Sequence, residues 1–324
     1  MPTLFLHGGA PKTGTSYIQV VLAQQAERLA EAGLLYPAGH LFEAARRGSV
    51  TSGNGVEMAN YINPNLPHRI ADKSAFAATF ARHLDEADGR DLVYSNEALR
   101  FPDNERSRHI VDVATGRGYV PVYIYLVREL AGFALSVYSQ LVKRHRETRT
   151  FAEFAAGWSP PYAAVIAESE AMFGAGNVQV HNYDAHRDRL ADLFVRDIFG
   201  LPLTLPAKPM VINRSLGAKE LAMMRVVNSL CRSTPRAAAF VSDAITSVDG
   251  GDTPLGISPR VAQSLSRHQD EVEFVNARIR GPAIRLVGAT ADGEEAGLTP
   301  VETAMAATLA RLVMRTMSAE ERPG

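Results

Sequence analysis

Short apolar runs of β-branched and aromatic residues alternate with longer segments of helical periodicity through the first two-thirds of the chain. This order of elements predicts an α/β fold with a central, mostly parallel sheet flanked by helices. The apolar runs place the expected strands at 3–7, 91–95, 120–127 and 177–181. The periodic segments place the expected helices at 16–32, 104–116, 131–145, 161–173 and 185–199.

The last third of the chain has a different pattern. From about residue 217 it is mostly helical, which predicts a helical C-terminal third. The expected helices cover 217–230, 259–278 and 299–317, separated by Gly- and Asp-rich segments at 247–257 and 287–297. We expect the polar tail after residue 318 to be frayed.

The segment 33–70 has little periodicity and is rich in Gly, Asn, Pro and Ser. A structureless connection of this length is uncommon inside a compact domain. The segment is therefore either disordered or a loop region with short helical pieces that faces a substrate.

Composition and charge exclude several classes of protein. The 324 residues include 34 Lys and Arg against 35 Asp and Glu, which gives a formal net charge of −1. No overall field would draw the protein to nucleic acid or to an anionic membrane. Cys231 is the single cysteine, which excludes an internal disulfide framework and a cysteine-based zinc site. With no signal-peptide pattern and no run of about 18 apolar residues, we expect a soluble, cytoplasmic protein with no transmembrane segment and no nucleic-acid partner.

A glycine-rich turn joins the first expected strand to the first expected helix. It reads Gly8-Gly-Ala-Pro-Lys-Thr-Gly-Thr-Ser16. A turn of this kind directs backbone N–H groups and a helix N-terminus toward an anion, so it predicts a phosphate site. It is not a Walker A motif, because Thr15 follows the second glycine and the lysine, Lys12, lies inside the loop.

A second cation follows the most apolar strand. The run 120–127 ends directly in Arg128, and Ser136 comes eight residues later on an expected helix. Arg presents a planar fork to phosphate oxygens, and a Ser hydroxyl adds a donor. Since the carboxyl ends of parallel strands carry the ligand sites of open sheets, we expect Arg128 near the glycine-rich turn.

Both motifs resemble those of the sulfotransferases that use 3′-phosphoadenosine 5′-phosphosulfate (PAPS). The run Pro11-Lys-Thr-Gly-Thr-Ser16 is similar to their 5′-phosphosulfate loop, and Arg128 with Ser136 is similar to their 3′-phosphate site. Arg214, in Asn213-Arg-Ser-Leu216, resembles a segment of bacterial members, although Ser215 fits a helix cap equally well. The nucleotide-binding residues that the resemblance implies are Pro11, Lys12, Thr13, Gly14, Thr15, Ser16, Arg128, Ser136 and Arg214.

The resemblance also implies a fold, a domain and a donor. The fold is a P-loop nucleotide-hydrolase-like sulfotransferase fold, and the resemblance covers a domain at 1–280, in which 33–70 forms the acceptor side. Residues 281–324 then form a C-terminal helical extension. The donor is PAPS, and no metal is required.

Sulfuryl transfer needs a base for the acceptor hydroxyl and a cation for the transferring group. Lys12 supplies the cation. Glu97 is the expected base because it follows the strand 91–95 at the same edge of the sheet, where burial can raise the pKa of a carboxyl group. Family members carry a His in the region after the first helix, but 52–59 contains none. Three residues therefore stay open as alternatives, namely Glu57, Glu43 and His40.

The expected function is transfer of a sulfuryl group from PAPS to a hydroxyl, or less readily an amine, of a carbohydrate or glycolipid. Two alternatives stay open. One is a nucleotide-dependent kinase, which would need Mg²⁺ ligands and a lysine where Thr15 stands. The other is a non-catalytic nucleotide-binding protein. The sequence determines neither the acceptor nor the oligomeric state.

Overall fold

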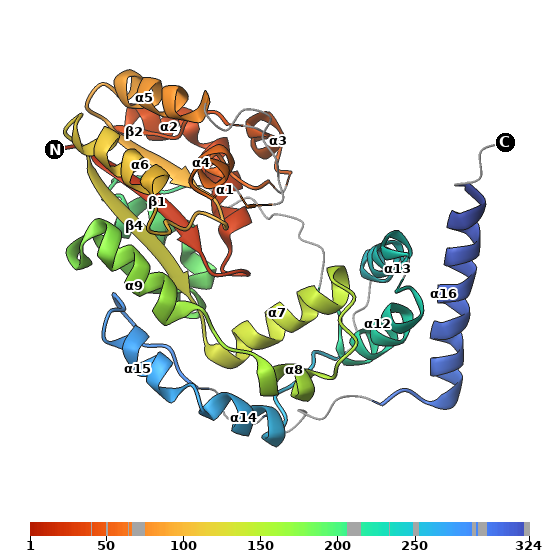
Figure 1. Cartoon of the computed structure of the whole chain (residues 1–324). Helices are drawn as coiled ribbons and strands as arrows, with labels where there is room; N and C mark the ends of the chain where they lie inside the picture. The colour runs from red at the N-terminus through yellow and green to blue at the C-terminus, as the bar shows by residue number, and fades with distance from the viewer. Residues whose placement is uncertain are drawn as a thin grey trace. The chain divides into compact units, whose positions relative to one another are not determined.

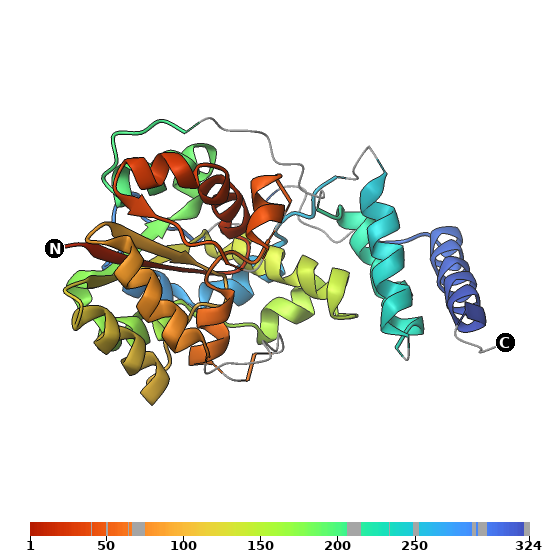
Figure 2. The same ribbon diagram turned by 90° about the horizontal axis from the view of Figure 1, so that it is seen from above.

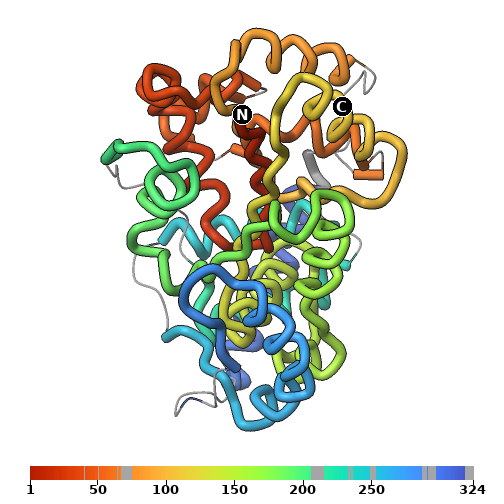
Figure 3. The backbone as a smooth tube through the Cα atoms, turned by 90° about the vertical axis from the view of Figure 1, so that its left-hand side faces the viewer, coloured from red at the N-terminus to blue at the C-terminus, as the bar shows by residue number. Residues whose placement is uncertain are grey.

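The computed structural model groups the chain into two units (Figure 1). The first unit consists of Met1–Arg128, Pro161–Met210 and Glu271–Ile284, and the second of Glu129–Pro160, Val211–Asp270 and Arg285–Gly324. The structure describes all residues except 40, 50, 64, 67–74, 206–214, 233, 249–252, 287–289, 291–296 and 321–324, which are grey in Figure 3. The domain limits expected from the sequence stay a prediction.

A parallel sheet forms the centre of the first unit. Its strands within the described residues are β1 (Thr3–Gly9), β2 (Leu34–Leu35), β3 (Asp91–Ser95), β4 (Val120–Val127) and β5 (Val178–Asn182). They pair in the order β2-β3-β1-β4-β5, and every pair is parallel. The α/β prediction is confirmed, and the four expected strands are present within two residues at each end. The short strand β2 was not expected.

Side chains alternate between the two faces of this sheet. Phe5, Val93 and Ile124 point to one face, where they pack against α1 (Thr15–Gln24) and the π-helical turn η3 (Leu193–Ile198). Tyr94 and Tyr123 point to the other face, which is covered by α5 (Ala75–Ala87), α6 (Glu105–Thr115) and α9 (Tyr162–Phe173). Figure 2 shows the sheet nearly edge-on, with α1 (red) on one face and α5 and α6 (orange) on the other. Because both faces are covered, the central strand β4 is apolar along its whole length rather than alternating with polar residues.

Several expected helices are divided. The expected helix 16–32 is two helices, α1 and α2 (Ala26–Glu31), because Gln25 leaves the helical region at φ −109° and ψ 12°. The expected helix 185–199 is a series of short pieces, namely α10 (Tyr183–His186), the 3-10 turn Arg187–Arg189, α11 (Leu190–Asp192) and η3; another 3-10 turn, Ala175–Asn177, precedes β5. In the described part of 33–70, α3 (Phe42–Arg46) and α4 (Val56–Ile62) are the short helical pieces that one of the two interpretations expected, whereas the strand β2 was not expected.

The described part of the second unit is helical. Its helices are α7 (Leu130–Arg144), α8 (Phe151–Gly157), α12 (Ala218–Leu230), α13 (Pro235–Ser247), α14 (Pro259–Ser266) and α16 (Pro300–Glu320). Both α12 and α13 pack against α7 and α16 around a core that includes Met224 and Cys231. The expected helix 259–278 is divided at Arg267 into α14 and α15 (Gln269–Asn276), the latter mostly in the first unit. The helical C-terminal third is confirmed.

Candidate active site

The glycine-rich turn has the geometry of an anion-binding loop. It leaves β1 at Gly9 and enters α1 at Thr15, and Ala10 N–H donates to the Leu126 carbonyl of β4 at 3.3 Å. Lys12 and Gly14 have positive φ angles of 66° and 74°. Left-handed residues in such a loop turn successive backbone N–H groups toward one concavity, and the N-terminus of α1 adds its partial positive charge. Thr13 stabilises the turn, because its hydroxyl donates to the Ala10 carbonyl at 2.7 Å.

Two glycines of the loop are needed for close approach. A Cβ on Gly9 would lie 2.9 Å from Thr15 Oγ1 and 3.0 Å from Thr13 Oγ1. A Cβ on Gly14 would lie 2.5 Å from Leu190 Cδ2, at a φ that side chains avoid. The loop is therefore packed against its own hydroxyls and against the α11 segment.

Arg128 lies against the glycine-rich loop, as expected. Its Nη1 donates to the Lys12 carbonyl at 3.2 Å, and its Nη2 lies 3.3 Å from Asp184 Oδ1. The guanidinium carbon is 5.5 Å from the centre of the Tyr183 ring. Among the described residues, Arg128 Nε is buried without a partner. The Tyr183-Asp184 pair, which directly follows β5, therefore orients this arginine.

Glu97 lies beyond β3 at the same edge of the sheet as the loop. Its side chain keeps contact with solvent, but nearby protein atoms raise its pKa above the ordinary carboxyl value, and the Lys12 cation opposes this rise. The opposing influence means that Lys12 and Glu97 are close enough to interact electrostatically. The structure thus brings together the two residues that the sequence assigned to catalysis.

The remaining residues that the sequence predicted for the site lie on other elements or outside the described residues. Ser136 is half-buried on α7, and Glu43 is exposed on α3, where it pairs with Arg46 at 3.7 Å. Glu57 is half-buried on α4, and its charge contributes to raising the pKa of Tyr94. His40 and Arg214 lie outside the described residues.

Sequence reasoning gave His7 no role, yet His7 is part of a buried polar network beside the loop. His7 and Ser95 are register partners on β1 and β3, and His7 Nδ1 lies 2.8 Å from Ser95 Oγ. The Gln19 amide nitrogen of α1 donates to the same Ser95 oxygen at 3.4 Å. Burial lowers the pKa of His7 to about 3. The sequence signal for this network was a histidine directly before the loop glycines.

Sequence reasoning also missed Asn54. Its side chain donates to the Val93 carbonyl at 2.9 Å and accepts from Ser95 N–H at 2.9 Å, and Gly55 N–H donates to the Ser95 carbonyl. The segment around Asn54 therefore follows the carboxyl end of β3 and satisfies backbone groups there. The clue was the run Ser52-Gly-Asn-Gly55, typical of a tight turn.

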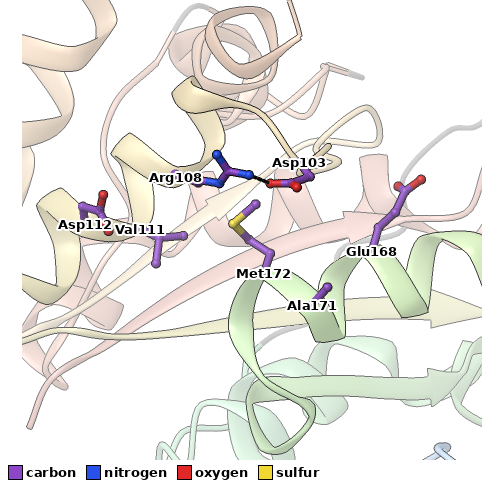
Figure 4. Close-up of a pocket in the computed structure, with 7 residues that line it drawn as sticks. All are labelled: Asp103, Arg108, Val111, Asp112, Glu168, Ala171 and Met172. Carbon is purple, nitrogen blue, oxygen red and sulfur yellow. Dashed lines mark hydrogen bonds and ion pairs between the residues drawn. The ribbon is translucent and has the colours of Figure 1, made fainter.

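A groove of about 540 Å³ lies between α6 and α9, away from the loop (Figure 4). Its lining residues are Asp103, Arg108, Val111, Asp112, Glu168, Ala171 and Met172. Arg108 donates to Asp103 at 2.5 Å, and the remaining charges are carboxylates. This lining does not suit a phosphate. Within the part of the chain that the structure describes, no three His, Cys, Asp or Glu side chains are grouped so that they could hold a metal ion. None of the described helices combines the length and the apolar character that spanning a bilayer requires.

No family model matches the sequence, and the comparison with curated proteins found no match. Two solved structures are similar to the chain. Both are sulfotransferases. The sulfotransferase from Alicyclobacillus acidocaldarius has 17% identity and a TM-score of 0.40, over 77% of this chain and 98% of that one. The sulfotransferase domain from the curacin biosynthetic pathway has 16% identity and a TM-score of 0.31, over 63% of this chain and 76% of that one. Both likenesses are distant.

Proposed function

We propose that the protein is a cytoplasmic, PAPS-dependent sulfotransferase. The observation that carries the proposal is the glycine-rich loop itself, in which Lys12 lies inside the turn and Thr15, not lysine, begins the helix. The Lys12 cation and the Glu97 carboxyl beside the loop add the charges that sulfuryl transfer uses.

The residues of the loop suit the phosphosulfate end of the donor. Thr15 Oγ1 is buried without a partner among the described residues, which leaves its hydroxyl available to an anion in the loop. Lys12, Thr13, Gly14 and Ser16 contribute the cation, the turn and further donors, and Pro11 shapes the loop's entry. Arg128 and Ser136 are the proposed ligands of the 3′-phosphate, with Arg214 as a further candidate.

The donor supplies a sulfuryl group that an acceptor oxygen takes over in line, with adenosine 3′,5′-bisphosphate as the leaving product. Lys12 offsets the negative charge that builds up on the departing phosphate. Glu97 accepts the proton of the acceptor hydroxyl, and its raised pKa makes its carboxylate a better proton acceptor than an ordinary one.

The acceptor that we propose is a hydroxyl of a carbohydrate or glycolipid. The region 33–70 supports this assignment because its short helices α3 and α4 follow β2 at the side of the sheet that includes Glu97. Its described part presents the exposed hydroxyl of Ser52, which suits a polyhydroxylated substrate, and Asn96, just beyond β3, holds this segment by donating to the Ser52 carbonyl at 2.6 Å.

Calorimetric titration with adenosine 3′,5′-bisphosphate, and in parallel with ATP and Mg²⁺, tests the proposal. We expect the bisphosphate to bind tightly without metal. Binding of ATP that needs Mg²⁺, with no binding of the bisphosphate, would instead assign a kinase. Bisphosphate binding with no transfer to any acceptor of a broad hydroxyl and amine panel would assign a non-catalytic nucleotide-binding protein.

Two variants test the residues. Lys12→Ala should lower the transfer rate about 100-fold or more. Arg128→Ala should weaken binding of the 3′,5′-bisphosphate about tenfold or more, but hardly change binding of adenosine 5′-phosphate. Arg100→Ala is the matched control, since Arg100 pairs with a surface carboxylate, Glu168, at 2.9 Å. Equal losses of affinity for both nucleotides would show that Arg128 is not a ligand of the 3′-phosphate.

A further inference from the structure

A chain of buried polar groups passes beneath the glycine-rich loop. It links Gln19 of α1, Ser95 of β3 and His7 of β1, all with 1% or less of their surface exposed. Burying three polar side chains is costly unless each has a partner. The proposed function so far gives none of them a role.

The donor and acceptor atoms of these side chains give the row of hydrogen bonds a direction. The Gln19 amide nitrogen can only donate, so Ser95 Oγ accepts from it and has its own hydrogen to give. In the described part of the chain, His7 Nδ1 is the acceptor within hydrogen-bonding distance of that hydroxyl. The ring is neutral at pH 7 because burial lowers its pKa to about 3, so its single proton lies on Nε2.

The protonated nitrogen points toward the loop. His7 Nε2 and Thr15 Oγ1 are both buried, and neither has a hydrogen-bond partner among the described residues. Both face the point that a Cβ of Gly9 would occupy, at 3.7 Å and 2.9 Å. The Phe194 ring lies against His7, with ring centres 4.6 Å apart, and holds the imidazole in place. A buried donor and a buried hydroxyl oxygen thus both lie within 4 Å of the point that a Gly9 Cβ would occupy.

We infer that His7 is a positioning residue for Thr15: when the loop closes on an anion, His7 Nε2–H donates to Thr15 Oγ1, and the Thr15 hydroxyl hydrogen then points to the anion. Hydrogen bonds run in one direction from Gln19 through Ser95 and His7 to Thr15. The identity of the anion, the phosphosulfate group of PAPS, rests on the proposed function. The absence of a side chain at Gly9 is what allows the two groups to approach.

Nitrogen NMR of the histidine rings tests the direction of these hydrogen bonds without any ligand. We expect His7 in the free protein at pH 7 to be the neutral Nε2–H tautomer. A neutral Nδ1–H tautomer would overturn the inference, because Nε2 would then have no proton to donate. Ser95→Ala should raise the population of the Nδ1–H form, since it removes the hydroxyl that donates to Nδ1.

A double-mutant cycle tests the coupling to Thr15. His7→Phe, which keeps a ring against Phe194, and Thr15→Val should each weaken binding of adenosine 3′,5′-bisphosphate about tenfold, as expected for one hydrogen bond to an anion. Because His7 acts through Thr15, the double variant should bind no more weakly than the weaker single variant. Losses that multiply to about 100-fold would overturn the inference. If His7→Phe does not fold, Ser95→Ala takes its place in the cycle.

The matched control is His83→Phe. Like His7, His83 forms a hydrogen bond between its Nδ1 atom and a hydroxyl group, in this case that of Tyr94 at 2.6 Å. His83 lies on α5, however, over the sheet face opposite to the one that His7 faces. We expect this variant to change the urea midpoint and not the affinity. If the unmodified protein binds no bisphosphate, the proposed function fails. The tautomer of His7 can still be measured without a ligand, and it still shows whether Nε2 has a proton to donate.

Discussion

Lys12 and Glu97 illustrate how one residue controls the chemistry of another. The two come from different strand ends and carry opposite charges. Glu97 is exposed, but the protein atoms around it remove part of its hydration and favour its protonated, neutral form, whereas the Lys12 cation favours the ionised form. The pKa of Glu97 is therefore a balance between these two influences, and it should change when either one is altered.

This balance predicts a pH dependence. As the proposed general base, Glu97 acts only after it has lost its proton, so the transfer rate at low substrate should rise with pH through its raised pKa. Glu97→Gln should remove this rise and lower the rate about 100-fold or more. In Lys12→Ala the opposing cation is gone, so the remaining activity should rise at a higher pH than in the unmodified protein. Rate measurements between pH 4 and 9 give all three profiles.

Glu168→Gln is the control for this prediction, because Glu168 pairs with Arg100 on the surface. Its profile should match that of the unmodified protein. If Glu57→Gln or Glu43→Gln removed the rise instead, the base would belong to the region 33–70.

At the scale of elements, the loop between β1 and α1 combines a strained backbone with tight packing. Gly14 begins α1 in the left-handed region, and its Cα faces Leu190 and Tyr183. Gly89 has nearly the same φ, 76° against 74°, but a Cβ there would meet no atom within 4 Å. These two glycines separate the cost of the backbone conformation from the cost of the packing.

Gly89→Ala should lower the free energy of unfolding by about 1 kcal/mol, the usual cost of a left-handed alanine. Gly14→Ala should lower it by about 3 kcal/mol, because overpacking against Leu190 adds about 2 kcal/mol. It should also weaken bisphosphate binding at least tenfold, whereas Gly89→Ala should not. Urea unfolding and calorimetry measure both quantities. Equal costs for the two variants would mean that the α11 segment moves freely away from the loop.

At the scale of the whole molecule, each unit is assembled from three separate segments of the chain. Cys231 and Trp158, the single cysteine and the single tryptophan, both belong to the second unit. Cys231 is fully buried, and Trp158 packs against Phe133 with ring centres 5.4 Å apart. The two residues therefore report on the same unit.

Cys231 should react with a thiol reagent only after the second unit opens. Burial also raises the pKa of its thiol, which lowers the thiolate fraction at neutral pH. We expect labelling without denaturant to be at least about 1000-fold slower than in urea, the ratio that a local stability of about 4 kcal/mol gives. The rise of the labelling rate with urea should follow the change in Trp158 fluorescence. Fast labelling in buffer would show that the core around Cys231 opens readily.

Much of the fold could be predicted from the sequence because its signals are local. The strand 120–127 is a continuous apolar run, and both its limits agree with β4. The break at Gln25 and the turns around η3 gave no such signal, because no proline or glycine marks them and their packing decides where the helix stops. The strand β2 is too short for a periodicity to be read.

The sequence by itself determined the glycine-rich loop and the cation inside it. Lys12, Gly14 and Thr15 are neighbours in the chain, so their spacing already contains the geometry of the turn. Tertiary structure alone decided which distant side chains meet that loop. Asp184 reaches Arg128, Ser95 reaches His7 and Asn54 reaches β3 across 41 to 88 residues of sequence. The reason is physical: parallel pairing fixes which strand ends lie side by side, and no local pattern records that register.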